Sequence, residues 1–200
     1  MATAFLLAVV PGQTVAMILR QAIIGGTKSA YMTLIGTSSA LIFWGSASAI
    51  GLSQIFARSH TAYSALKYAG VAFLTFLALQ TLWSLRKEFG KFDYEGVTTV
   101  GLFPAIRLGF LTNLTNVKAA VFAVAFIPAF VPKNFSLGWG VFLLSIIQAL
   151  TSTTWYSFLI HMIGRATTTL ANPKVRRALT AFSAIGILFL AATLLLTSPR

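Results

Sequence analysis

The chain of 200 residues predicts an all-α membrane protein with six transmembrane helices, arranged as two inverted three-helix repeats whose first and fourth helices are broken. Composition supports the membrane class, because 57% of the residues are hydrophobic and 9% are charged, against about 25% charged residues in a soluble domain. Apolar segments give the number of helices, and a single hydrophilic loop divides them into two groups of three. We expect one integral membrane domain over residues 1–200.

A helix that crosses a bilayer needs about 20 apolar residues. Six segments meet this length, and they are residues 2–24, 33–57, 62–85, 106–131, 137–163 and 179–197. Glycine and proline mark several of the connections, for example Gly25-Gly26 and Asn172-Pro173. The first segment lacks the basic start and the cleavage site of a signal peptide, so we expect it to be a span of the mature fold.

The hydrophilic loop, residues 86–104, separates repeat one (1–85) from repeat two (105–200). It contains every acidic residue of the chain, Glu88, Asp93 and Glu95. Because three spans precede this cytoplasmic loop, repeat two would cross the membrane in the opposite direction to repeat one. Such inverted repeats are common in secondary transporters, which bind substrate near the middle of the bilayer where corresponding helices are broken. The pattern therefore favours a transporter.

Each repeat has an interruption in its first helix. Pro11-Gly12 interrupts the first span, and the polar residues Asn116 and Lys118 interrupt the fourth. A proline inside a helix leaves backbone N–H groups free, and the positive end of the following half-helix favours an anion. In the fourth span, Asn116 or Thr115 is suited to cap a half-helix that begins near Lys118. Both interruptions indicate binding of a carboxylate.

Lys118 is the strongest candidate for substrate binding. It lies about 16 Å along a straight helix from Arg107, near mid-membrane, where the penalty for a lysine is roughly 2.5–3.5 kcal/mol. The alternative is a lysine whose ammonium group reaches the membrane surface and only defines topology. Asn113 and Asn116 are further candidates, and their alternative role is to pack helices together through hydrogen bonds.

Two other groups of residues are candidates for lining a cavity. Gln13 and Thr14 follow the Pro-Gly pair and would line the same interruption, unless that pair is an ordinary kink of a membrane helix. Trp155-Tyr156 follows a run of serine and threonine residues and would either line a cavity or belong to the core or an interface belt.

The chain carries 15 Lys and Arg against three acidic residues, a formal net charge of +12. The basic residues lie between apolar segments and form no continuous stripe, so we expect contacts with membrane lipids and no nucleic-acid partner. One side of the membrane would carry Arg20, Lys28, Arg86, Lys87, Lys91, Arg107, Arg165, Lys174, Arg176 and Arg177, and the other Arg58, Lys67, Lys133 and Arg200. By the positive-inside rule the first set is cytoplasmic, which places both termini outside.

The residues that are absent exclude several kinds of chemistry. The chain has no cysteine, and its two histidines, His60 and His161, lie far apart in sequence, so we expect no disulfide, no metal and no cofactor. No span contains an acidic residue, so a membrane enzyme would lack its acid–base pair. Because the spans contain no acidic residue, the ammonium group of a zwitterionic substrate has no protein carboxylate there as a partner. Three alternatives follow. Backbone carbonyl groups bind the ammonium group, or the substrate is not an ordinary zwitterion, or ion coupling uses His161, Lys118 or another ion.

Four motifs stand out along the chain. They are Val10-Pro11-Gly12, Gly25/Gly26 with Gly36, the segment 66–74 (LKYAGVAFL) and the segment 110–120 (FLTNLTNVKAA). In order, spacing and total length they resemble the LysE/RhtB family of amino-acid exporters. The resemblance implies a six-helix inner-membrane protein that exports amino acids or related metabolites, uses a proton or other ion gradient, and often forms oligomers.

The chain departs from the family pattern at several positions. Gln13 and Thr14 stand where the family commonly has a second proline and an aspartate, and Val117 stands where it has a proline. The segment IPAF at 127–130 replaces a Phe-Pro-Gln-Phe motif. Fewer residues precede Pro11 than in the family, which fits either a short first helix or a start upstream of Met1.

We therefore expect a secondary-active exporter of an amino acid or a related small carboxylate metabolite in the bacterial inner (plasma) membrane. Its partners would be this substrate, a coupling ion (proton or sodium), lipids and further copies of itself in a homo-oligomer. The substrate-binding residues would be Pro11, Gly12, Gln13, Thr14, Asn113, Asn116 and Lys118. The alternatives are a passive channel and a membrane scaffold subunit, and a membrane enzyme is the least favoured.

Overall fold

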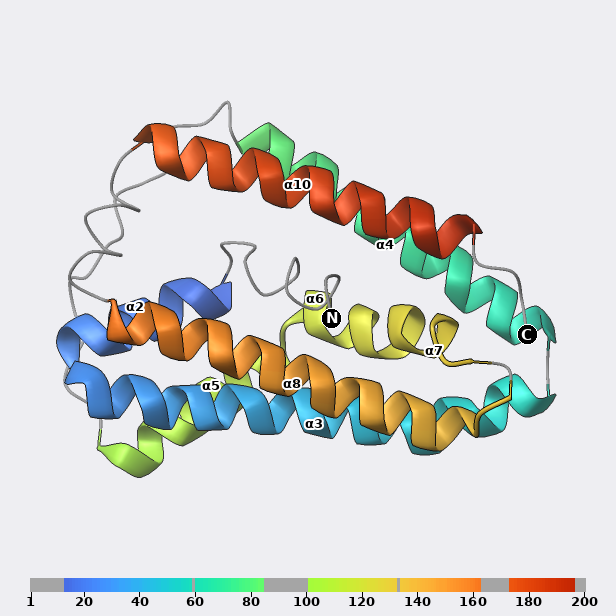
Figure 1. Ribbon diagram of the computed structural model, residues 1–200, viewed down its shortest axis with the longest axis horizontal. Helices are drawn as coiled ribbons and strands as arrows, with labels where there is room; N and C mark the ends of the chain where they lie inside the picture. Colours follow the sequence, from blue (N-terminus) through green and yellow to red (C-terminus); the bar gives the residue numbers. More distant parts are fainter. Residues whose placement is uncertain (1–12, 59, 85–100, 133, 163–172, 197–200) are drawn as a thin grey trace.

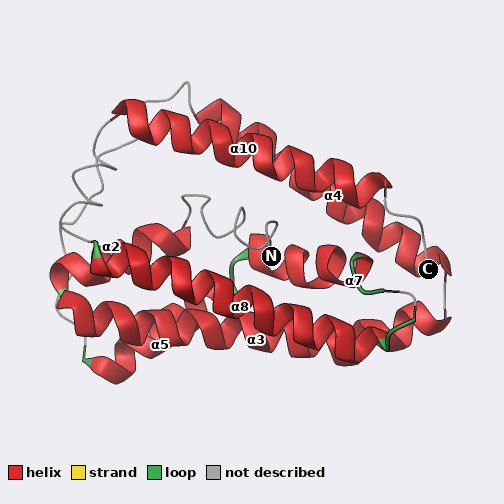
Figure 2. Ribbon diagram, viewed as in Figure 1, coloured by secondary structure: helices red, strands yellow, loops and turns green. Residues whose placement is uncertain are grey.

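Every described element of the protein is a helix (Figures 1 and 2). The computed structural model describes residues 13–58, 60–84, 101–132, 134–162 and 173–196. Pro11, Gly12 and the predicted hydrophilic loop as far as residue 100 lie outside the described residues. For the described part of the chain, the predicted all-α class is confirmed.

The helices follow the order of the predicted spans. In the first half they are α2 (Gln13–Ile24), α3 (Gly26–Arg58) and α4 (His60–Ser84). In the second half they are α5 (Leu102–Leu114), α6 (Val117–Val121), the π-helix η1 (Phe122–Phe126), α7 (Ile127–Ala129), α8 (Leu137–His161) and α10 (Pro173–Leu196). Each predicted span therefore overlaps at least one described helix. The relation of the two halves as inverted repeats stays a prediction.

The lengths of the helices support an integral membrane protein. Among the described residues, two helices are long and apolar enough to cross a membrane on their own, over Gly26–Gly51 and Leu137–His161. The bent pair Leu102–Leu114 and Val117–Ala129, with an angle of 60° at the break, forms a third candidate span. Shorter apolar stretches lie in the remaining helices, so the full number of six spans stays a prediction.

Four helices, α3, α4, α5 and α10, begin earlier than the predicted spans. α3 begins at Gly26 and includes Lys28, in a polar turn that the predicted span 33–57 leaves out. Gly26 has a φ of +74°, a conformation that glycine adopts easily and that lets the chain change direction after α2. α5 begins at Leu102 and has Pro104 in its first turn. Proline is tolerated there because the backbone N–H groups of the first turn have no carbonyl acceptor within the helix. The hydrophilic loop therefore ends before residue 104.

The helices form two groups that the broken helix connects (Figure 1). One group contains α2, α3, α5 and α8, and the other is the pair α4 and α10, which pack along each other. Between them, Phe122 and Phe126 of η1 share one apolar cluster with Leu74 of α4 and Leu190 of α10. A movement of the broken helix would therefore affect both groups.

α3 and α5 cross at a pair of glycines. A Cβ atom on Gly36 would overlap the carbonyl oxygen of Ile106, and a Cβ atom on Gly109 would overlap the carbonyl oxygen of Thr33. Small residues allow the backbones of membrane helices to approach this closely. The crossing brings Thr37, the neighbour of Gly36, against α5.

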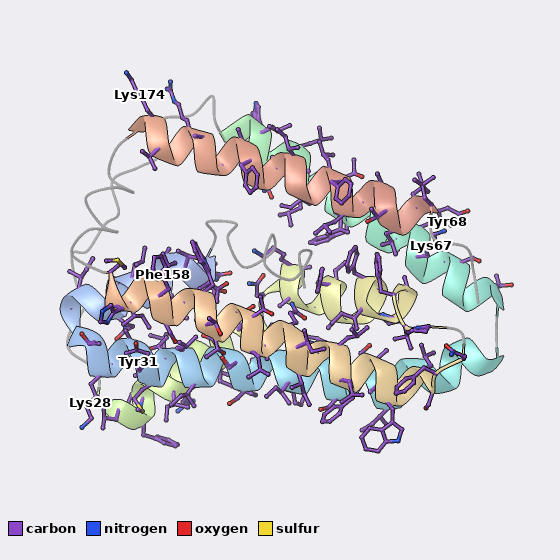
Figure 3. All side chains as sticks on the ribbon, viewed as in Figure 1. Lys28, Tyr31, Lys67, Tyr68, Phe158 and Lys174 are labelled. Carbon is purple, nitrogen blue, oxygen red and sulfur yellow. The ribbon has the colours of Figure 1, made fainter. Side chains whose placement is uncertain are left out.

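Lys67 of α4 joins its helix to α10. Its side chain is buried, and its Nζ donates a hydrogen bond of 2.8 Å to the carbonyl oxygen of Leu195 in the last turn of α10. Figure 3 shows Lys67 where α4 and α10 lie side by side. A cation is favourable at this position, because the carbonyl groups at a helix C-terminus carry partial negative charge. Lys67 therefore has a structural partner.

Candidate functional site

The fourth span breaks between Leu114 and Val117. α5 ends at Leu114, and the hydroxyl of its C-cap residue Thr115 donates a hydrogen bond of 2.9 Å to the carbonyl oxygen of Leu111 in the last turn. Asn116 is extended, with φ −78° and ψ 101°, and its side-chain oxygen accepts the backbone N–H of Lys118 at 3.1 Å. The N-cap predicted from the sequence is confirmed for Asn116. The break therefore rests on an asparagine and needs no proline at position 117.

Polar side chains from three helices meet at this break. Thr14, near the start of α2, donates from its hydroxyl to the side-chain oxygen of Asn113 at 3.4 Å. Asn116 donates from its amide to the hydroxyl of Thr14 at 3.3 Å. Asn113 donates to the carbonyl oxygen of Thr37 in α3 at 3.1 Å. Tertiary packing thus brings together residues from both halves of the sequence.

A small cavity lies beside these residues. Its lining comes from α2, α3, the broken helix and α8, and consists of Thr14, Thr37, Leu41, Asn113, Asn116, Lys118, Ala119, Gln148, Ser152 and Tyr156. The cavity volume is about 20 Å³, which is enough for one water molecule and too small for an amino acid. An amino acid can therefore enter only when the surrounding helices move apart.

Lys118 brings a positive charge to this otherwise uncharged lining. Its side chain is half-buried. The acidic residues of the chain all lie between positions 88 and 95, outside the described residues, so no carboxylate of the described part faces the ammonium group. The described residues also contain no group of three His, Cys, Asp or Glu side chains that could hold a metal ion. The arrangement is therefore suited to a small anion.

Four of the predicted binding residues line the cavity, namely Thr14, Asn113, Asn116 and Lys118. Gln13 is exposed at the start of α2 and is not part of the lining. The side chain of Gln13 points about 100° away from that of Thr14 around the helix axis, and in this structure only Thr14 faces the cavity. Pro11 and Gly12 lie outside the described residues. His161 is exposed at the end of α8 and does not reach the cavity.

Two of the three cavity residues on α8 are not among the candidates from the sequence. Gln148, Ser152 and Tyr156 line the cavity at intervals of one helical turn. Of the three, only Tyr156 is a candidate from the sequence, together with Trp155. Trp155 does not line the cavity and packs beside the apolar cluster of α2, α3 and α8 to which Tyr156 belongs. Polar residues at helical spacing inside an apolar span are the signal that could have found the other two. Thr37 of α3 was missed as well.

Asn116→Ala is expected to destabilise the break, because the backbone N–H of Lys118 loses its cap. Loss of an N-cap costs about 1 kcal/mol, so the midpoint of thermal unfolding in detergent should fall by about 2–4 °C. Asn116→Ser is the matched control, because serine keeps a capping oxygen and should preserve most of the stability. Equal unfolding temperatures for the two variants would show that the cap does not stabilise the break.

Comparison with known proteins extends over nearly the whole chain. Residues 5–198 match the family described as LysE type translocator. A homoserine/homoserine lactone efflux protein of Salmonella typhimurium (strain LT2) is 29% identical over 202 residues, which cover 99% of this chain and 94% of the relative. A leucine efflux protein of Salmonella choleraesuis is 25% identical over 190 residues, 93% of this chain and 87% of the relative.

A third relative comes from a different bacterium. The uncharacterized membrane protein YrhP of Bacillus subtilis is 23% identical over 181 residues, which cover 87% of this chain and 86% of the relative. No solved structure gives a significant match to the chain. The family match over residues 5–198 spans the segment that forms the break.

Proposed function

Because the chain belongs to the family of LysE type translocators, we propose that it is a secondary-active exporter of an amino acid or a related small carboxylate metabolite. Members of this family are transporters and not enzymes. The names of two relatives specify efflux of homoserine, homoserine lactone and leucine, which supports a small amino-acid-like substrate for this chain. The inner (plasma) membrane is the location we propose.

Lys118 is the observation that carries this proposal. Its ammonium group lines a polar cavity beside a broken helix, and the described part of the chain offers it no carboxylate. Ionisable residues inside membrane proteins commonly mark a substrate or ion path, and Lys118 lines the cavity, whereas Lys67 bonds to a carbonyl oxygen of α10. The carboxylate of an amino acid would supply the missing negative charge. The helix that starts at Val117 begins beside the cavity, and its positive end favours the same anion.

Transport requires the site to open to each side of the membrane in turn. The cavity volume of about 20 Å³ is too small for an amino acid, so we assign substrate entry to a movement of helices around the break. Asn116 and the Gly25-Gly26 pair are suitable pivots, because α-helices end and begin again there. In two inverted three-helix repeats, Pro11-Gly12 would be the equivalent interruption of the first repeat.

The positions of basic residues support an orientation in the membrane. Lys28 of α3 and Lys174 of α10 lie at the same end of the molecule, and Lys67 lies toward the other end (Figure 3). Cytoplasmic segments of membrane proteins carry an excess of lysine and arginine. We therefore propose that the end with Lys28 faces the cytoplasm, with both termini on the outer side.

Purified protein in liposomes tests the proposal. We expect accumulation of labelled leucine or homoserine against its concentration gradient when a proton or sodium gradient is imposed, and no accumulation once an ionophore has collapsed that gradient. Liposomes without protein are the control. Flux that needs no gradient would overturn the proposal in favour of a passive channel, and no flux across a panel of amino acids and small carboxylates would overturn it in favour of a scaffold subunit.

A further inference from the structure

We propose that Gln148, Ser152 and Tyr156, together called the α8 face, bind the ammonium group of the substrate and restrict transport to amino acids without a second positive charge. This rests on the proposed function, in which Lys118 binds the carboxylate. The α8 face would then decide which amino acids the transporter accepts.

The α8 face lies inside the molecule and opens on the cavity. Its three residues are four positions apart, so their side chains share one side of the helix. Their exposed fractions are 4%, 5% and 6%, in sequence order. All three line the same cavity as Lys118. A substrate bound to Lys118 would therefore contact the α8 face as well.

The polar groups of the α8 face have no partner within the part of the chain that the structure describes. Their side chains make no hydrogen bond there, and none of their polar atoms is sealed from the cavity. Other buried polar groups nearby are satisfied, since Thr14 bonds to Asn113. Ser145, on the same helix, donates to the carbonyl oxygen of Val141 at 2.7 Å. Because buried polar groups in native proteins are almost always hydrogen-bonded, the unpartnered set indicates a ligand.

The chemistry of the α8 face fits a single ammonium group. Such a group has three N–H donors, and the face offers three neutral oxygen acceptors, the amide oxygen of Gln148 and the hydroxyl oxygens of Ser152 and Tyr156. A lysine or arginine substrate would bring a second cation into a cavity that already contains Lys118. No acidic residue lies in any predicted span to compensate it. The face therefore favours substrates such as leucine or homoserine.

Conservative variants in the liposome assay test the α8 face. Tyr156→Phe and Ser152→Ala each remove one hydroxyl and keep the rest of the side chain. We expect each to raise the KM for leucine or homoserine about tenfold, the factor for loss of one hydrogen bond to a charged group, with a smaller change in kcat. Ser145→Ala is the matched control, because this buried hydroxyl bonds to its own helix and does not line the cavity, and its KM should stay unchanged.

Gln148→Glu tests the charge argument in the opposite direction. It supplies the carboxylate that the cavity lacks, so we expect lysine to compete with the neutral substrate at least about tenfold more strongly than it does with the wild-type protein. Since this variant introduces a charge into the membrane, its fold is checked by thermal unfolding in detergent. If it does not fold, Tyr156→Phe and Ser152→Ala decide the question.

The outcomes separate this inference from the proposed function. If the wild-type protein carries no amino acid, the proposed function is wrong and the inference with it. If the wild-type protein carries leucine or homoserine but lysine competes equally well, only the inference is wrong. The same holds if folded Tyr156→Phe and Ser152→Ala proteins keep the wild-type KM.

Discussion

Lys118→Ala is expected to abolish transport while the protein still inserts and folds. The substrate carboxylate loses its charged partner, and truncation of one member of a buried charge pair costs about 2–5 kcal/mol, so kcat/KM should fall by about thirtyfold or more. Folding stability should stay the same or rise, because a lysine inside the bilayer costs roughly 2.5–3.5 kcal/mol. Transport in liposomes and thermal unfolding in detergent measure the two effects.

Two further lysine variants make the result specific. Lys28→Ala removes an exposed lysine near the start of α3 and should leave transport unchanged. Lys118→Arg keeps the charge and should retain part of the activity, although the guanidinium group differs in shape. Normal transport by Lys118→Ala would show that the carboxylate binds elsewhere. A lower unfolding temperature for Lys118→Ala would show that this lysine serves the fold.

The broken fourth helix could be predicted because its cause is local. An asparagine followed two residues later by a lysine, in an otherwise apolar segment, indicates a cap and a new helix start. The structure agrees, since Asn116 accepts the backbone N–H of Lys118. The 60° angle of the break could not be predicted, because it depends on how α5 and the following helix pack against α3 and α8.

Two of the lysines in the described helices, Lys67 and Lys118, show a difference that the local sequence does not determine. Lys67 and Lys118 both interrupt apolar segments, and hydropathy treats them alike. Their roles differ because Lys67 reaches the carbonyl oxygen of Leu195, more than a hundred residues away, while Lys118 faces a cavity. Only the packing of distant helices decides which lysine has a structural partner.

The α8 face depends on packing in the same way. Ser145 and Ser152 are both buried serines on one helix, and nothing in the local sequence distinguishes them. In the structure, Ser145 bonds to its own helix, whereas Ser152 lines the cavity. The sequence also does not show which of Gln13 and Thr14 faces the cavity, because the direction of each side chain depends on how α2 is rotated against its neighbours.

The crossing of α3 and α5 controls the geometry of the site. At Gly36 and Gly109 the backbones are so close that a Cβ atom on either glycine would overlap a carbonyl oxygen of the other helix. Next to Gly36, the carbonyl oxygen of Thr37 accepts the amide of Asn113 at 3.1 Å, and Asn113 in turn accepts from Thr14. A wider separation of the helices would break this series of hydrogen bonds.

Gly36→Ala is therefore expected to lower both stability and transport. The added methyl group overlaps backbone atoms, which cannot rotate away, so α3 and α5 must separate. Overpacking of this kind lowers the free energy of unfolding by about 1–3 kcal/mol, which corresponds to a fall of roughly 2–10 °C in the unfolding midpoint. Gly51→Ala is the control on the same helix, because its Cβ would meet nothing within 4 Å, and alanine should preserve or slightly raise stability there. Equal unfolding midpoints and equal transport for the two variants would show that the site does not depend on this crossing.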